Sequence, residues 1–360
     1  MPPDSVLRFA WPADAAGWVL LIVALASIGL VPRVWPRLQA VPLPAWIAAW
    51  AVFAAVASAA YIVLYLRGGP RIIDATSYWL AARGLADGTP SWEVMAPTAS
   101  FRGRFLLSSL HDGHLSVGVI FPPGYPTVLA LGFLLRAPMA VGPLLGAALV
   151  MVTALLARHV TGHPDGARIA AVISSLNACL RYHTADTMSH GLAALCLVGA
   201  VLFAVRGSCR VRPAAAAACW TVAGFLAAWL LLTRPASAIA LVAVGLPVVT
   251  YGALRRRTAA PLWALAGAAP ALVWLAIHQH AVTGSWWQLS QTAYYLLADG
   301  PAGCFRYGFG EGIGCRLEHG FYVESVLPDG YGLRAALRTT GRRLHLHLAD
   351  VMNCAPFAVL

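Results

Sequence analysis

Long apolar runs separated by short polar segments dominate this sequence of 360 residues. A helix needs roughly 20 mostly apolar residues to cross the hydrocarbon core of a bilayer. Runs that reach or approach this length lie at 15–31, 45–66, 139–157, 167–182, 189–205, 213–232, 236–254 and 259–278. A last apolar stretch begins near Leu344 and is cut off at Leu360. The pattern predicts an all-α, polytopic transmembrane helical bundle with about eight or nine spans.

Two long segments that are less apolar interrupt this bundle and predict exterior loops with short interfacial helices. The chain is thereby divided into N-terminal transmembrane helices at 1–66, a first exterior loop at 67–138, a transmembrane bundle at 139–278, a second exterior loop at 279–343, and the start of a further helix at 344–360, in a sequence that is either truncated or naturally short. In the first loop, Tyr78, Trp79 and Leu85 are expected to face lipid headgroups, because Tyr and Trp favour that depth.

The composition limits the solvent that this chain can fold in. Hydrophobic residues make up 59% of the chain and charged residues only 11%, whereas a soluble domain has roughly 45–50% and about 25%. So few charges cannot cover the surface of a soluble globule of this size. The composition therefore excludes a soluble enzyme, a disordered chain and a small disulfide-rich scaffold.

The charge of the chain then suggests an orientation. The net charge is +11, and all 25 basic residues are arginines. They gather in short clusters between apolar runs, as in cytoplasmic loops, and form no stripe of the kind that binds nucleic acid. Four clusters alternate with the predicted spans, at 33–37, 158–168, 206–212 and 255–257. If these clusters are cytoplasmic, the N-terminus lies outside. Because an all-arginine set is typical of a GC-rich bacterial genome, we expect a multi-pass protein of a bacterial cytoplasmic (inner) membrane.

The middle of each predicted span is almost free of ionisable residues. A transporter usually concentrates polar groups near the middle of the bilayer, where an Asp or Arg costs about 2.5–3.5 kcal/mol on insertion scales. In this chain most carboxylates fall on the predicted exterior side instead. The distribution favours chemistry at the exterior membrane surface over transport through the membrane.

Two carboxylates lie where exterior segments meet predicted helices. Asp74 follows a Gly-Gly-Pro segment at 68–70, and it either caps a short helix or has a function in an exterior cavity. Asp186 precedes His190 by four residues, which would place both side chains on one helical face. This pair either supplies polar groups to the cavity, holding an acceptor or a metal, or is an N-cap beside a surface histidine.

The first loop also contains His111-Asp112-Gly113-His114. A zinc site needs three or four converging ligands, and this spacing matches no known zinc signature. A solvated Asp-Gly turn flanked by histidines is therefore the favoured interpretation. Further along, the rigid segment Phe121-Pro-Pro-Gly-Tyr125-Pro126 is expected to lead a short helix into the headgroup region.

Together these segments resemble the GT-C membrane glycosyltransferases, which include the protein mannosyltransferases and the lipid A aminoarabinose transferases. The segments that carry the resemblance are Asp74-Ala-x-x-Tyr78-Trp79-x-Ala-Ala-Arg83, Phe121-Pro-Pro-Gly-Tyr-Pro, Leu155-Leu-Ala-Arg158, Asp186-Thr-Met-Ser-His190 and Leu231-Leu-Thr-Arg234-Pro235. The likeness extends over residues 60–345 and depends on the order of the motifs and their side of the membrane.

The resemblance implies an inverting transferase that moves a sugar from a polyprenyl-phosphate carrier to an acceptor hydroxyl outside the membrane. It makes Asp74 the general base and gives Asp186 a second role in the same cavity. An arginine would neutralise the leaving phosphate, because its planar fork matches phosphate oxygens. Candidate substrate-binding residues are Arg181, Arg234, His190, Tyr125, Glu318 and His319, with Arg102 and Arg104 as further candidates. The expected partners are the lipid-linked donor, a lipid, glycan or protein acceptor, and membrane lipid; no cofactor is specified, and a divalent metal stays open.

Of the seven cysteines, Cys304 and Cys315 share the second exterior loop. Disulfides persist outside the cytoplasm, so we expect these two to pair and to close a glycine-rich loop. A second function class also fits the sequence, namely a non-catalytic GT-C-like protein or a flippase for lipid-linked sugars. That class predicts that Asp74 and Asp186 do not converge on one cavity, and a purely structural membrane subunit predicts no large exterior cavity.

Overall fold

The computed structural model describes residues 22, 25–94, 105–111, 114–209, 212–256, 258–298, 310, 320–321, 324–325, 327 and 329–351. Contacts divide the chain into two units. The larger unit comprises Pro42–Leu176 and Leu180–Tyr294, and the smaller one comprises Met1–Val41, Asn177–Cys179 and Tyr295–Leu360. All candidate site residues that the structure describes belong to the larger unit.

Among the described residues, six helices are long and apolar enough to cross a membrane. They are α3 (Leu43–Leu64), α6 (Val141–Thr161) with the preceding turn η3 (Pro138–Ala140), α9 (Ser189–Cys209), α10 (Pro213–Thr233), α11 (Pro235–Arg256) and α12 (Ala260–Thr283). Each coincides with one of the apolar runs found in the sequence. The prediction of an all-α, multi-pass membrane protein is confirmed at this level.

The apolar run at 167–182 is interrupted. It forms α7 (Pro164–Leu176) and α8 (Ala178–Ala185), and Asn177 lies between them. The hydroxyls of Ser174 and Ser175 donate to the carbonyls of Ala170 and Val172, at 2.6 and 2.9 Å. Such bonds within the last turn compete with the helix ladder and favour its end there. The run therefore returns along the bundle as two short helices.

The two terminal runs do not add continuous spans within the part of the chain that the structure describes. The run at 15–31 lies mostly outside it, and η1 (Ile28–Leu30) leads into α2 (Val31–Gln39). The run from Leu344 is the end of α15 (Leu333–Val351), a helix with several arginines. In the described residues the predicted eight or nine spans are thus represented by the six helices and the α7–α8 pair.

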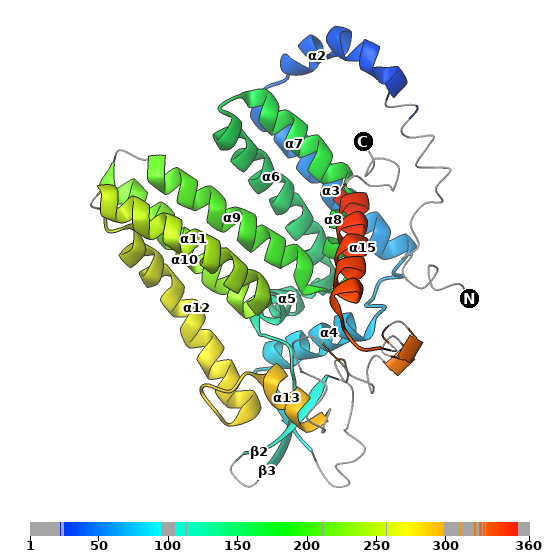
Figure 1. The fold of residues 1–360 in the computed structure, drawn as a ribbon, viewed down its shortest axis with the longest axis vertical. Helices are drawn as coiled ribbons and strands as arrows, with labels where there is room; N and C mark the ends of the chain where they lie inside the picture. The colour runs from blue at the N-terminus through cyan, green and yellow to red at the C-terminus, as the bar shows by residue number, and fades with distance from the viewer. Residues whose placement is uncertain are drawn as a thin grey trace. The chain divides into compact units, whose positions relative to one another are not determined.

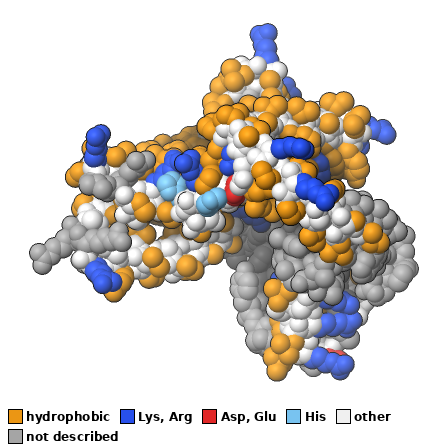
Figure 2. Space-filling view, turned by 90° about the horizontal axis from the view of Figure 1, so that it is seen from above, with side chains coloured by type: hydrophobic (Ala, Val, Ile, Leu, Met, Phe, Trp, Pro, Cys, Tyr) orange, Lys and Arg blue, Asp and Glu red, His pale blue; other side chains and the backbone are white. Residues whose placement is uncertain are grey.

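The long helices of the larger unit pack side by side (Figure 1). In one group α10 packs between α9 and α12, and in the other α3 packs against α6 and α7. Their outward faces are apolar: Val244, Leu262 and Leu265 are 65–73% exposed. Figure 2 shows hydrophobic side chains over much of the visible face, with separate arginines among them. This surface fits lipid as its solvent.

The segment between α3 and α6 contains two helices and a small sheet. The helices are α4 (Ile73–Ala86) and α5 (Gly124–Leu134), and the sheet is built from β1 (Ser91–Glu93), β2 (Leu106–His111) and β3 (His114–Val119). All pairs are antiparallel in the order β1-β3-β2. The strands were not predicted, although β2 and β3 are joined across an Asp-Gly pair, which is a typical hairpin signal. His111 pairs with His114 in the ladder, while residues 112–113 lie outside the described part.

This segment is fixed to the C-terminal ends of two spanning helices. The backbone of Gly124 lies so close to Thr233 of α10 that a Cβ at residue 124 would overlap its hydroxyl. Ser290, at the start of α13 (Ser290–Ala298), donates through its Oγ to the Ile120 carbonyl at 2.8 Å, and its N–H donates to Gln279 of α12 at 2.8 Å. The position of α4 and α5 at this end of the helices is therefore set by backbone approach and buried hydrogen bonds.

Candidate functional site

Two buried hydrogen bonds tie α4 to the turn between α8 and α9. The Thr187 hydroxyl donates to the Ala75 carbonyl at 2.9 Å. The Tyr78 hydroxyl donates to Ser189 Oγ at 3.1 Å. Because Ala75 follows Asp74 and Thr187 follows Asp186, these bonds hold the segments of the two candidate carboxylates against each other.

Asp74 lies in the first turn of α4 and is half-buried. The N-cap of α4 is Ile72, which makes no side-chain capping bond. The interpretation of Asp74 as a helix N-cap is therefore wrong. A carboxylate in the first turn is still favoured by the helix dipole, which stabilises negative charge at that end.

Asp186 is almost completely buried, at 1% exposure, in the bend between α8 and α9. Its Oδ1 accepts the N–H of Thr187 at 2.8 Å, whereas its buried Oδ2 has no hydrogen-bond partner among the described residues. Burial raises the pKa of this carboxyl group, and the bond from Thr187 opposes the rise only in part. An unsatisfied buried oxygen is costly, so Asp186 is a strong candidate for contact with a ligand.

The predicted pairing of Asp186 with His190 on one helical face is wrong, because Asp186 precedes α9 and lies in a bend. The ring of His190 stacks instead on His183 of α8, with centroids 4.4 Å apart and planes 3° apart. The Nδ1 atoms of both rings are buried without a hydrogen-bond partner in the described part of the chain.

Aromatic rings form a compact wall beside this polar cluster. Tyr78 stacks on Phe121 at 4.4 Å and meets Tyr125 edge-on at 5.5 Å. Burial raises the pKa of Tyr78 to about 12, against the opposing effects of Ser189 and Arg234. Burial and the charge of Asp186 also raise the pKa of the completely buried Tyr125. Both phenols thus stay protonated, and the prediction that Tyr78 faces lipid headgroups is wrong.

Arg234 is the C-cap of α10 and is half-buried. It directly follows Thr233, whose hydroxyl lies against the backbone of Gly124, the residue before Tyr125. Arg181 lies in α8, where it lines a narrow crevice between α3, α6, α7 and α8 together with Ser174 and Thr184. The structure thus places Arg234 beside the start of α5, and Arg181 five residues before Asp186 on the helix that leads into the cluster.

Several predicted residues lie outside the described part of the chain. They are Glu318, His319, Cys304, Cys315, Arg102 and Arg104. The disulfide and the contribution of the second loop to the site therefore stay predictions. Within the described residues, no group of three or more histidine, cysteine or acidic side chains could hold a metal ion.

Sequence reasoning missed four residues that build the cluster: His183, Thr187, Ser189 and, as a buried group, Tyr78. A partial signal was present, because Tyr78 follows Asp74 by four residues and so lies near it along α4. The remaining three sit around Asp186 in a polar run that interrupts two apolar segments. The gap between the apolar runs at 167–182 and 189–205 indicated a break here, but it did not show that these side chains would converge on α4.

Three comparisons with known proteins were made for this chain. The scan against protein-family models finds no match, and the searches of curated proteins and of solved structures find none either.

Proposed function

We propose that this protein is a membrane glycosyltransferase that moves a sugar from a polyprenyl-phosphate carrier to an acceptor hydroxyl. The observation that supports it most directly is the pair of buried hydrogen bonds, Thr187 to Ala75 and Tyr78 to Ser189, that join the Asp74 and Asp186 segments. A site of this kind needs two polar groups fixed relative to each other in a partly dry environment.

In the proposed reaction the acceptor oxygen attacks the anomeric carbon of the sugar while Asp74 takes the hydroxyl proton. The bond from that carbon to the phosphate oxygen breaks, and its electron pair leaves with the polyprenyl phosphate. Attack and departure on opposite faces invert the anomeric centre. General base catalysis of this type contributes about 10²–10⁴-fold to the rate. Asp74 suits this role better than Asp186, because Asp74 is half-exposed.

Asp186 would position the acceptor, since the unpartnered Oδ2 accepts a hydrogen bond from a substrate hydroxyl. Arg234 would stabilise the phosphate of the donor and of the leaving group, because a guanidinium binds phosphate oxygens in pairs. The His183 ring adds a hydrogen-bonding group, because its buried Nδ1 has no partner among the described residues. The stacked aromatic rings of Tyr78 and Phe121 form an apolar wall next to these polar groups.

The proposed setting is a bacterial cytoplasmic membrane with loops 67–138 and 279–343 outside. In that orientation the cluster lies at the exterior ends of α9 and α10, where a lipid carrier places its phosphate. The eight or nine spans of the proposed topology then include the α7–α8 pair and the terminal segments.

The experiment uses the full chain in nanodiscs with synthetic polyprenyl-phosphate mannose and polyprenyl-phosphate arabinose, one hexose donor and one pentose donor. A cell-envelope extract supplies the acceptor, and mass spectrometry measures the released polyprenyl phosphate. We expect release that depends on the extract, and a loss of about 10²–10⁴-fold in Asp74→Asn. The matched control is Asp87→Asn, since Asp87 is an exposed carboxylate at the other end of α4.

Full activity of Asp74→Asn would overturn the assignment of the base. A flippase is distinguished in proteoliposomes, because it would move the intact donor across the membrane without releasing polyprenyl phosphate. Transfer of intact donor by both the wild type and Asp74→Asn, with no cleavage by either, would replace the proposed transferase with a transporter.

A further inference from the structure

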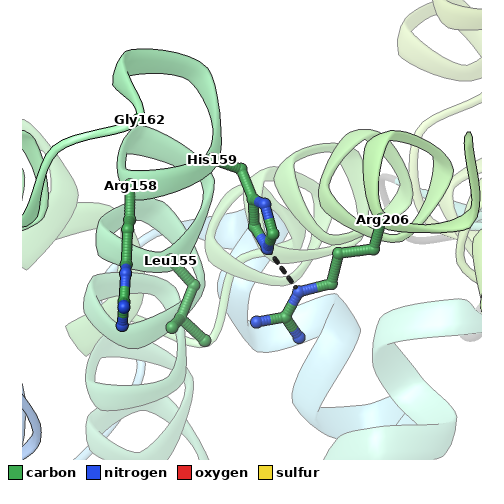
Figure 3. Close-up of a pocket in the computed structure, with 5 residues that line it drawn as sticks. All are labelled: Leu155, Arg158, His159, Gly162 and Arg206. Carbon is green, nitrogen blue, oxygen red and sulfur yellow. Dashed lines mark hydrogen bonds between the residues drawn. The ribbon is translucent and has the colours of Figure 1, made fainter. Parts of the chain in front are cut away.

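A second polar site lies at the opposite end of α9 from His190. Arg206 comes 16 residues after His190, a distance of about 24 Å along a helix that rises 1.5 Å per residue. Arg206 lines a hollow of about 350 Å³ together with residues from the end of α6 (Figure 3), namely Leu155, Arg158, His159 and Gly162. This hollow is separate from the candidate transferase site.

The hollow is organised by a hydrogen bond between two spanning helices. Arg206 Nε donates to His159 Nε2 at 2.9 Å, drawn as a dashed line in Figure 3. A histidine nitrogen that accepts a hydrogen bond belongs to an uncharged ring at that position. The bond uses one of the five N–H donors of the guanidinium and sets the direction of its fork. Arg206 is therefore held at one side of the hollow and is not simply extended into solvent.

The charge of the lining is of one sign. Among the described residues, the five that line it include Arg158 and Arg206 and no carboxylate. Asp165, in the first turn of α7, pairs with Arg168 at 3.4 Å and with His163 at 3.5 Å. Figure 3 shows the Arg158 and Arg206 side chains on two sides of the hollow, with Leu155 between them. Two guanidinium groups across one hollow are suited to a ligand with several anionic oxygens.

The position of the hollow near the ends of two candidate spans indicates which anion it would meet. Arg158 and Arg206 each lie three residues before the end of a candidate span, in α6 and α9. At this depth the polar groups of a bilayer are the phosphates of its lipids, and Leu155 adds an apolar surface on the bilayer side. Figure 2, which views the helices from above, shows arginine and histidine side chains together among hydrophobic ones.

We propose that this hollow binds the phosphate group of an anionic ligand at the membrane surface, held between Arg158 and Arg206. The phosphate comes from an anionic phospholipid headgroup or from a soluble phosphate, and the experiment distinguishes these two sources. The site does not depend on the proposed transferase activity, because it lies at the other end of the spanning helices.

The experiment titrates the detergent-purified full chain with dioleoylphosphatidylglycerol and follows bound lipid by native mass spectrometry. Dioleoylglycerol has the same acyl chains without phosphate and serves as the lipid control, and inorganic phosphate serves as the soluble competitor. We expect saturable binding of phosphatidylglycerol. Each single variant, Arg158→Gln or Arg206→Gln, should bind about tenfold more weakly, because it loses charge-assisted hydrogen bonds. Arg255→Gln, which changes an exposed arginine at the end of α11, should bind as the wild type does.

Inorganic phosphate is also titrated alone: phosphate binding that Arg158→Gln weakens assigns the site to a soluble phosphate, whereas phosphatidylglycerol binding without phosphate binding assigns it to a lipid headgroup. Equal binding of dioleoylglycerol, or an equal loss in Arg255→Gln and Arg158→Gln, would overturn the proposal. Arg158 is exposed, so Arg158→Gln is expected to fold, and its melting temperature should equal that of the wild type. If Arg206→Gln proves unstable, Arg158→Gln alone carries the test.

Discussion

At the scale of single residues, Asp186 combines deep burial with an oxygen that lacks a hydrogen-bond partner within the described residues. Its pKa in the folded protein is raised above the ordinary value of 3.8, chiefly by burial. The folded state therefore holds the proton more tightly than the unfolded state does. The stability that follows is fully present below pH 3.8 and is lost as the pH rises through the folded pKa.

We predict that the unfolding free energy of the wild type, and with it the melting temperature, falls as the pH is raised above about 4. This group contributes at most about 1.4 kcal/mol of unfolding free energy per pH unit. Asp186→Asn removes the titration and should flatten that part of the curve. The measurement is thermal unfolding in detergent across this pH range, with Asp87→Asn as the exposed control. A wild-type slope that persists unchanged in Asp186→Asn would show that another group is responsible.

Residue identities could be predicted from the sequence more readily than residue contacts. Asp74 and Asp186 stood out because the chain has only 14 acidic residues and most lie outside the apolar runs. Their partners could not be deduced, because a tyrosine at the membrane interface and a buried tyrosine look alike in sequence. Tyr78 is buried since Ser189, 111 residues away, satisfies its hydroxyl, and that contact is decided only by the tertiary fold.

At the scale of elements, the joint between α4 and the α8–α9 turn is the feature on which the candidate site depends. Thr187→Val keeps the shape of the side chain and removes the hydroxyl that donates to the Ala75 carbonyl. We predict a loss of about 1–3 kcal/mol of unfolding free energy, the cost of leaving a buried partner unsatisfied. We also predict a lower rate of polyprenyl phosphate release, because the Asp74 and Asp186 segments are then no longer held in a fixed position relative to each other.

The matched control is Thr76→Val on the exposed face of the same helix. The Thr76 hydroxyl bonds only within α4, to the Ile72 carbonyl at 3.1 Å, so its removal should change the unfolding free energy by less than about 0.5 kcal/mol. Denaturant unfolding and donor cleavage are measured on both variants. Equal effects of the two substitutions would mean that the Thr187 bond does not hold the two segments together.

Long helices could be predicted from the sequence, whereas a break within an apolar run and short strands could not. Six spanning helices follow directly from apolar runs of about 20 residues, because lipid leaves the backbone no other way to satisfy its hydrogen bonds. The break at Asn177 was missed, since a short apolar run does not reveal where a helix stops. The sheet was missed because its strands have six residues or fewer, and their burial depends on α12 and α13.

At the scale of the whole molecule, contacts from the α4–α5 segment hold together the start of α9 and the ends of α10 and α12 in the larger unit. Tyr78 bonds to the start of α9, Gly124 lies against the end of α10, and Ser91 donates to the Ala281 carbonyl near the end of α12. The other ends of α6 and α9 meet through Arg206 and His159. The arginines at the ends of α6, α9 and α11 thus lie at the opposite end of these helices from the candidate site, which is the arrangement that the positive-inside rule requires of an exterior site.

This arrangement makes the orientation testable with one cysteine at each end. Thr89, in the exposed turn after α4, and His163, in the exposed turn after α6, are suitable positions, introduced after the native cysteines have been replaced by serine. We predict that a membrane-impermeant maleimide labels Thr89→Cys in intact bacterial cells, and that it labels His163→Cys only after the membrane is opened. The reverse pattern would put the Asp74 segment in the cytoplasm, where a nucleotide sugar becomes a more plausible donor than a polyprenyl phosphate carried on the exterior face.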